Sequence, residues 1–475
     1  STAVVCTGAV LTALALGGAL ALLATRTDLP GRRMLSGAAL LAACVPVYVS
    51  LVALFGFLPA YRLTGSAAAC GLIYGLIYTP LAGLLLGAAF GATEREAEEQ
   101  ALLDAPAPYV LLRVTLPQTI WAFLATGVAV LLLVATDFSV SDLLTVRTFA
   151  EEVYTQFALD RRHAGPLLTG APVLVLLAVL LVTVQRRLRV VGEHASGAPS
   201  APPHRFRLGH WRWPAALTCL AIGLAAAVLP AASILRHVGP LAGLGQVAVG
   251  FRHELWTSLI LAAGGATAIL LPAAGLAWHL ARGGRHGWLT AAAVVLLLAT
   301  PAPMVGISLI ALLNNATLGW FYDSPLVVAA GYFVRFLPVA VLLLVPGVQR
   351  VPRELEWASR VDGCDWWREH WHVRLPAIVA DGALVWLVIV ILCFAEIGST
   401  VLLTPPGWET VAVRAFGLLH FGVYRDLAVL ALLAVGFILL PWALLLWILK
   451  RRPKKEPDGA EVVANPSWTR SDKRM

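Results

Sequence analysis

Residues 3–25 read AVVCTGAVLTALALGGALALLAT, an apolar stretch without a charged side chain. A helix of about 20 such residues crosses a hydrocarbon core about 30 Å thick. Ten further apolar stretches follow, at 34–58, 66–91, 118–136, 166–185, 214–235, 256–281, 288–313, 325–349, 377–403 and 426–449. The sequence therefore predicts an all-α polytopic membrane protein with about eleven transmembrane helices. A β-barrel would instead show alternating segments of about 10 residues.

The composition excludes an ordinary soluble enzyme and a disordered chain. Only 13% of the 475 residues are charged, whereas a soluble domain averages about 25%. Hydrophobic residues make up 59% of the chain and the mean hydropathy is +0.80, while disorder requires low hydrophobicity.

The basic residues lie mainly on one side of the predicted spans. If loop 26–33 is cytoplasmic and the spans alternate, 26 of the 35 Lys and Arg fall on the cytoplasmic side. This is the positive-inside asymmetry, so the net charge of +8 reports orientation and not a nucleic-acid partner. It predicts an external N-terminus and a cytoplasmic C-terminus in a plasma membrane.

The lysines exclude one function for this chain. All four lie at or after residue 450, so no G-x-x-x-x-G-K-[ST] phosphate loop is present. If ATP drives the protein, a separate subunit must hydrolyse it. No nucleophile–base cluster or metal-ligand cluster is apparent either, so we expect no enzymatic activity, no cofactor and no resident metal.

The chain contains an internal repeat. Glu94–Pro117 and Val351–Pro376 each carry acidic residues, then Ala and Asp, and end in V-x-L-P; Asp104 precedes Asp362 by 258 residues and Pro117 precedes Pro376 by 259. We interpret this as two parallel six-helix repeats, with the first helix of the first repeat absent. The predicted units are a first permease-like repeat at 1–185, a cytoplasmic linker at 186–213, a second repeat at 214–450 and a disordered tail at 451–475.

Each repeated stretch predicts a short cytoplasmic helix. Residues 94–104 contain neither Gly nor Pro, residues 354–362 likewise, and both begin with acidic side chains that favour a helix N-terminus. Asp362-Gly363 predicts a helix stop. Such a helix in each half is a surface that could dock a partner twice, or an interfacial helix that caps the bundle.

The two loops resemble the coupling loop of permeases from binding-protein-dependent ABC importers, E-A-A-x3-G-x9-I-x-L-P. The second loop has Ala358-Ser359 for the paired alanines, Gly363, and after nine residues Val373-Arg374-Leu375-Pro376. Trp357 stands where the family has Glu, with Glu356 beside it. The first loop keeps Glu99 and Ala101 but has Gln100 for one alanine, no Gly after Asp104, and two prolines.

The resemblance implies a division of labour. In this family the loop helix docks on an ATPase subunit, and an extracytoplasmic binding protein delivers the substrate. It therefore implies a bacterial inner-membrane permease whose partners are an ABC ATPase homodimer, a substrate-binding protein and the lipid bilayer. The residues that it assigns to ATPase coupling are Glu99, Ala101, Asp104, Glu356, Ala358, Asp362 and Gly363.

Two acids at matching positions suggest a pathway. Asp137 and Glu396 lie 259 residues apart, each at the end of an apolar run. Acids in such segments are costly and usually face a cavity or a partner, and a pair of carboxylates suits a hard cation. Either they line the pathway, or each pairs with an Arg or ends a helix in solvent. Arg335, also within a span, requires an acidic partner that the sequence does not identify.

The fusion of two repeats in one chain resembles the ferric-iron importer permeases, and also those for thiamine and aminophosphonates. Residues 394–422 most resemble the ferric-iron group, so ferric iron is the expected substrate. The alternatives are thiamine or another small organic solute and, less favoured, a secondary transporter without an ATPase. Secondary transporters usually have broken helices or several intramembrane ionisable groups, whereas the feature repeated in this chain lies in its cytoplasmic loops.

Overall fold

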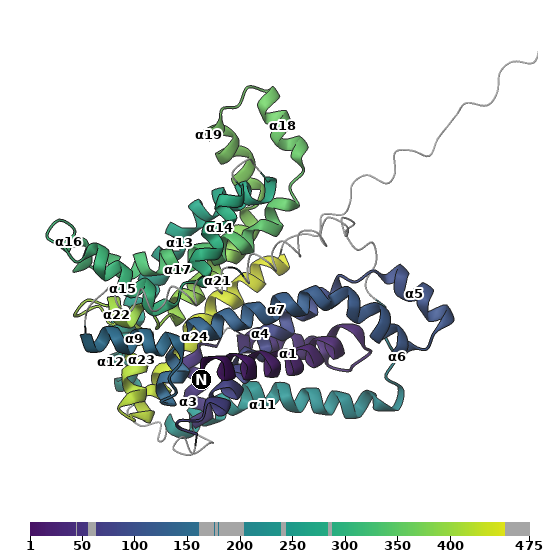
Figure 1. Ribbon diagram of the computed structural model, residues 1–475, viewed down its shortest axis with the longest axis horizontal. Helices are drawn as coiled ribbons and strands as arrows, with labels where there is room; N and C mark the ends of the chain where they lie inside the picture. Colours follow the sequence, from purple (N-terminus) through teal and green to yellow (C-terminus); the bar gives the residue numbers. More distant parts are fainter. Residues whose placement is uncertain are drawn as a thin grey trace, which may run out of the picture.

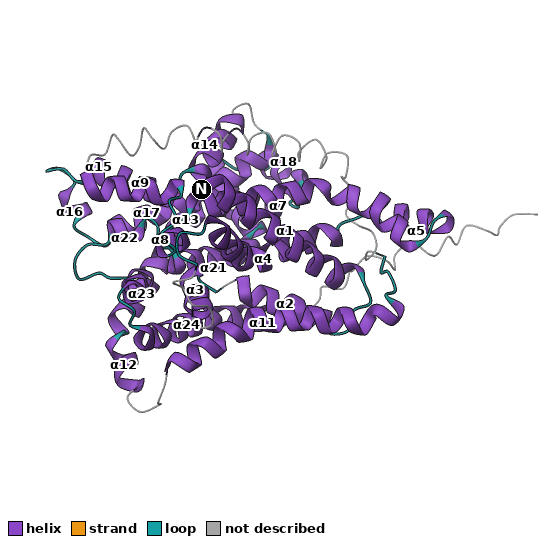
Figure 2. Cartoon of the chain, turned by 60° about the horizontal axis from the view of Figure 1, so that its bottom comes forward, coloured by secondary structure: helices purple, strands orange, loops and turns teal. Residues whose placement is uncertain are grey.

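The computed structural model describes residues 1–43, 45–55, 63–160, 175, 179, 204–238, 244–283 and 287–451. Throughout this part of the chain the regular elements are helices (Figures 1 and 2), and a single isolated bridge joins Thr27 to Phe206. The predicted span 166–185, linker residues 186–203 and tail residues 452–475 lie outside the described residues, apart from helical residues 175 and 179.

The first half of the chain forms two long helices, α1 and α4, followed by a loop helix and a third long segment. The elements are α1 (Thr2–Arg26), α2 (Arg32–Ala43), α3 (Val47–Phe55), α4 (Ala67–Gly91), α5 (Arg95–Asp104), α6 (Ala107–Val110), η2 (Leu111–Thr115), α7 (Leu116–Thr136), α8 (Ser139–Leu143) and α9 (Phe149–Asp160).

The second half repeats this order after one extra long helix, α11. The elements are η3 (Gly209–Trp211), α11 (Arg212–Val238), α12 (Leu244–Gly250), α13 (Arg252–Arg282), α14 (Gly287–Ala299), α15 (Ala302–Leu313), α16 (Gly319–Tyr322), α17 (Leu326–Gln349), α18 (Arg353–Val361), α19 (Trp366–Glu369), η4 (His370–Arg374), α20 (Leu375–Ala377), α21 (Val379–Ala395), α22 (Thr400–Leu403), α23 (Val411–His420) and α24 (Tyr424–Arg451).

The polytopic all-α class is confirmed. Among the described residues, five helices are long and apolar enough to span a membrane, namely α1, α4, Ala107–Thr136, α13 and α17, and two bent helix pairs raise the number to seven. Three predicted spans are not continuous. Residues 377–403 bend by 75° where α20 meets α21, and α21 ends at Ala395 before a separate α22. Residues 34–58 divide before Pro46, and residues 288–313 bend by 103° between α14 and α15 at Pro301, because proline removes a helical hydrogen bond and restricts the preceding residue.

The three long helices of each half pack alike. Helix α1 contacts α4 and α7, and α13 contacts α17 and α21 in the same way. The α1–α4 contact depends on small residues: a Cβ on Gly17 would lie 2.9 Å from the Thr79 carbonyl oxygen. Close packing through small side chains is the ordinary way in which membrane helices associate. The predicted division into two repeats stays a prediction, and the predicted end of the first repeat, residue 185, lies outside the described residues.

Helix α11 connects the halves. Although it begins the second half, it packs against α2 and α3 of the first half as well as α24, and Ala216 and Cys219 share an apolar cluster with Leu29 and Leu35. Figure 1 shows α5 and α18 projecting apart from one another, α18 at the top and α5 at the right, whereas α9 lies near α15. The halves therefore meet away from the loop helices.

Candidate functional site

The two predicted loop helices are present with nearly the predicted bounds. Helix α5 covers Arg95–Asp104 and α18 covers Arg353–Val361, each with two acidic residues in its first turn, where the helix dipole favours negative charge. The predicted stop at Asp362-Gly363 is confirmed: Gly363 has φ +75°, and the Cys364 amide donates to the Ser359 carbonyl at 3.0 Å. This 6→1 bond is the closure of a Schellman motif.

The residues predicted to couple to an ATPase lie mostly on the outer face of these helices. In the first loop Glu99 and Asp104 are exposed and Ala101 is half-buried; in the second, Ala358, Asp362 and Gly363 are exposed. Glu356 is the exception, with 6% exposure. Their coupling role stays a prediction.

Glu98, the fully buried acid of the first loop, is not among the residues predicted from the sequence. It forms an ion pair with Arg26, at the end of α1, and accepts a hydrogen bond from the Thr115 hydroxyl at 2.8 Å. Arg26 also donates to the Thr93 hydroxyl at 2.8 Å. The signal was available in the repeat, because Glu98 precedes Glu356 by the same 258 residues that separate Asp104 from Asp362.

Glu356 in the second loop is held by a larger charged network. Its Oε1 lies 2.6 Å from Arg282 Nε, at the end of α13, and its Oε2 lies 3.7 Å from Arg374 Nη2. Arg374 also pairs with Glu369 at 2.7 Å. The guanidinium groups of Arg282 and Arg374 lie 5.3 Å and 5.4 Å from the Trp278 ring centroid, a cation–π arrangement.

Both loops present apolar side chains at their surface. Leu103 and Val361 are each 85% exposed. Other large exposed apolar residues on the loops are Tyr109 and Leu112 in the first, and Leu355, Trp357, Trp367 and Trp371 in the second. Apolar patches with polar neighbours are typical of protein or membrane contact sites.

The two matched acids occupy equivalent breaks in the helices. Asp137 follows the last residue of α7 and Glu396 the last residue of α21. Asp137 accepts hydrogen bonds from the Ser139 amide at 2.8 Å and hydroxyl at 2.6 Å. Glu396 accepts from the Ser399 amide at 3.0 Å and hydroxyl at 3.3 Å. Each acid therefore satisfies backbone that the helix break leaves open.

Glu396 is the partner that Arg335 required, with Arg335 Nε 2.8 Å from Glu396 Oε2. Asp137 lies within electrostatic range of both groups. The structure thus places Asp137 of the first half within electrostatic range of an ion pair of the second half. Of the two acids, Glu396 is the one whose side chain pairs with an arginine. We call Asp137, Arg335 and Glu396 the charged cluster.

Near the charged cluster the two halves contact one another directly. Phe138 packs on Phe416 with ring centroids 5.9 Å apart, and His420 Nε2 lies 2.9 Å from Asp142 Oδ2. The hydrogen bond to Asp142 raises the pKa of His420, although partial burial opposes the shift.

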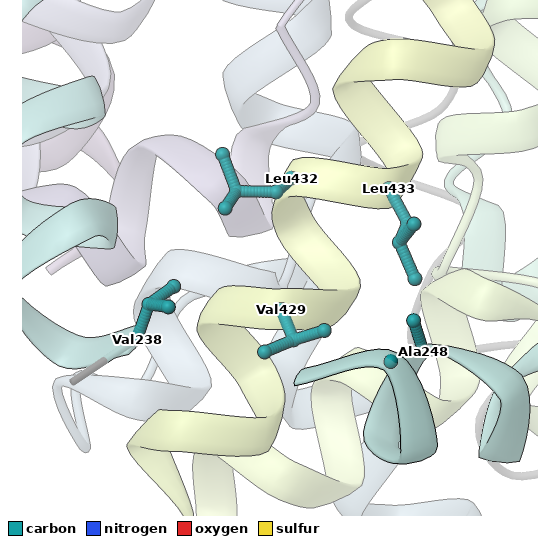
Figure 3. A pocket seen from close by; sticks show the side chains of 6 residues that line it. Val238, Ala248, Val429, Leu432 and Leu433 are labelled. Carbon is teal, nitrogen blue, oxygen red and sulfur yellow. The ribbon is translucent and has the colours of Figure 1, made fainter. Parts of the chain in front are cut away.

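A separate apolar pocket of about 240 Å³ lies between α11, α12 and α24 (Figure 3). It is lined by Val238, Gly245, Ala248, Val429, Leu432 and Leu433. It contains none of the residues of the charged cluster, so it offers apolar packing only.

The fold and these sites define a polytopic helical membrane protein that presents one loop helix per half. Residues 271–450 match the family described as binding-protein-dependent transport system inner membrane component. This stretch runs from α13 to α24 and includes α18, Arg335 and Glu396. The similarity to this family thus falls within the second half of the chain.

Curated relatives match over a similar length. A putative 2-aminoethylphosphonate transport system permease protein, PhnV, of Salmonella paratyphi A is 27% identical over 157 residues, covering 33% of this chain and 59% of the relative. The protein of the same name from Salmonella typhi is 26% identical over 142 residues, covering 30% and 54%. The chain thus spans a little over half the length of these relatives, whose names specify an aminophosphonate and not iron.

Proposed function

We propose that this chain is the membrane permease of an ABC importer, with both halves in one polypeptide. A separate ATPase homodimer hydrolyses ATP, and an extracytoplasmic binding protein delivers the solute. The loop side is cytoplasmic in this proposal, because 26 of the 35 Lys and Arg fall on that side when the spans alternate.

The observation that carries this proposal is the repeated loop helix. Helices α5 and α18 occupy equivalent places, expose apolar side chains and are each fixed to the end of a long helix by a buried glutamate. Two matched surfaces suit a partner with twofold symmetry, since each half would contact one copy. The family match at residues 271–450 supports the same role.

For the substrate we propose a small zwitterionic solute of the aminophosphonate class. The charged cluster combines two carboxylates with one guanidinium, so it offers partners of both signs to a molecule with an amine and an acidic group. The names of the relatives, which specify 2-aminoethylphosphonate, support this class.

Ferric iron is the second candidate, favoured by the two carboxylates contributed from opposite halves. Arg335 weakens it, because its ion pair compensates the charge of Glu396 and leaves Asp137 as the uncompensated carboxylate. A trivalent cation in a low dielectric requires more negative charge than this. Thiamine remains a further organic candidate without a specific contact in its favour.

Uptake into vesicles distinguishes these substrates. The chain is reconstituted with its ATPase and binding protein, and 2-aminoethylphosphonate, ferric citrate and thiamine are offered in turn. We expect ATP-dependent uptake of the aminophosphonate. Uptake of iron alone would overturn the zwitterion proposal, and absence of ATP-dependent uptake of any solute would count against the permease.

Arg335 provides the matching variant test. Changing Arg335→Gln together with Glu396→Gln removes both charges of this ion pair at once and leaves Asp137 in place. Aminophosphonate uptake should fall at least about tenfold, because a phosphonate loses its cationic partner. A route for iron would lose one of its two carboxylates in the same variant, so the substrate is decided by the uptake comparison above. This variant tests whether the pair lines the route, and unchanged uptake would remove the pair from it.

A further inference from the structure

An arginine–glutamate pair joins each loop helix to a long helix of its own half. Arg26 is the last residue of α1 and pairs with Glu98 of α5; Arg282 is the last residue of α13 and pairs with Glu356 of α18. The two pairs occupy equivalent positions of the repeat. Two loops that differ in most other residues therefore keep the same connection.

The surroundings of the first pair fix its geometry. Both side chains are fully buried. Arg26 is held by the Thr93 hydroxyl and, at 3.4 Å, by the Phe90 carbonyl oxygen, while the Thr115 hydroxyl binds Glu98 from η2. Helix α5 is thus connected at one carboxylate to the end of α1 and to the segment that leads into α7.

Stability alone does not account for a buried ion pair at this place. Desolvation consumes much of the attraction between buried charges, and apolar residues of similar volume often stabilise a protein as well or better. A charged pair with several hydrogen bonds does add fixed direction and distance, because its geometry is specific.

The connected helices lead to the charged cluster. Helix α1 packs against α7, which ends at Asp137, and α13 packs against α17 and α21, which carry Arg335 and precede Glu396. A displacement of either loop helix, if transmitted through its ion pair, reaches the residues of the cluster through one helix–helix contact.

We propose that Glu98 and Glu356, with Arg26 and Arg282, are positioning residues that transmit movement of the docked ATPase to the membrane helices. This inference rests on the proposed function. It assigns transmission to the buried glutamate of each loop and leaves contact with the ATPase to the exposed face that carries Glu99 and Trp357.

The test measures movement and not substrate, so it does not depend on which solute is carried. Spin labels are placed at Ile120→Cys on α7 and Leu343→Cys on α17, both exposed positions on different halves, in a Cys364→Ser background. The chain is assembled with its ATPase in nanodiscs, and the distance between labels is measured before and after trapping with ATP and vanadate.

The variant for this test is Arg26→Met with Glu98→Gln, which removes both charges and leaves none unpaired. We expect its complex to form and to hydrolyse ATP, while the fraction showing the trapped distance falls at least about fivefold, the lower bound of typical coupling between sites. Glu96→Gln, an exposed first-turn acid of the same helix, is the matched control and should keep the full response.

Three outcomes separate the possibilities. Loss of the trapped distance with ATP hydrolysis retained supports transmission. A normal trapped distance in those complexes that form, even if fewer form, would show a structural role only and overturn the inference. If the unchanged chain binds no ATPase, the proposed function fails first, and the unchanged arm reports this independently of the variant.

Discussion

Each of the two loop helices is joined to a long helix of its own half by a glutamate–arginine ion pair, but the groups around the two pairs differ. In the first loop a single fully buried pair, Arg26–Glu98, is completed by neutral hydroxyl groups. In the second, Glu356 is shared among Arg282, Arg374 and Arg360, and a glycine in the left-handed region closes the helix. The charge of Glu98 in the first loop is therefore compensated by one arginine, whereas the charge of Glu356 in the second is compensated by several.

The largest expected difference between the loops concerns loss of the arginine. Arg26→Met leaves Glu98 buried without a cation and should lower the free energy of unfolding by ~3–5 kcal/mol. Arg282→Met should cost less, about 1–3 kcal/mol, because Arg374 still faces Glu356. Thermal unfolding of the purified chain in nanodiscs compares the two. Equal losses would show that the network does not share the charge of Glu356.

The next difference concerns how each loop helix ends. Gly363→Ala places a Cβ at φ +75°, which costs ~1–2 kcal/mol in the left-handed region, and no atom lies within 4 Å to add a clash. Ala105, which follows α5, has φ −142° and accepts any L residue without strain. Gly363→Ala should therefore reduce ATP-coupled uptake more than Ala105→Ser, and equal effects would remove the asymmetry between the loops.

The smallest expected effect concerns the pH dependence of stability at the contact between the halves, where His420 lies 2.9 Å from Asp142. The pKa of His420 is raised by Asp142, so its contribution to stability is complete below its unfolded value of about 6.5 and is lost as the pH rises through the higher folded value. The chain should lose stability between pH 6 and pH 8 by more than the His420→Gln variant does. An identical pH dependence in the two proteins would remove His420 from this contact.

The sequence predicted what depends on local residues. The bounds of the loop helices, the glycine stop and the equivalence of Asp137 with Glu396 follow from acidic first turns, a glycine and a repeat offset. The breaks at Pro46 and Pro301 carried a local signal as well, but the continuous apolar composition around them concealed it.

The sequence did not predict contacts that depend on which face of a helix meets the body. The family pattern assigned Glu99 to the loop, but its neighbour Glu98 is the buried acid. Adjacent residues of a helix lie on different faces, so one can be exposed while the next is buried. The partner of Arg335 lies 61 residues away, so no local pattern identifies it. Interactions between distant elements required the structure.

We propose that this chain moves solute only when a separate ATPase docks on both loop helices. The most direct measurement is disulfide cross-linking from Ala101→Cys and, separately, from Ala358→Cys into cysteines placed on its ATPase, together with ATP hydrolysis by the chain alone and by the assembly. The account predicts cross-links from both positions, no hydrolysis by the chain alone, and hydrolysis by the assembly. ATP hydrolysis by the purified chain, or assembly with the ATPase without cross-links from either loop, would contradict it.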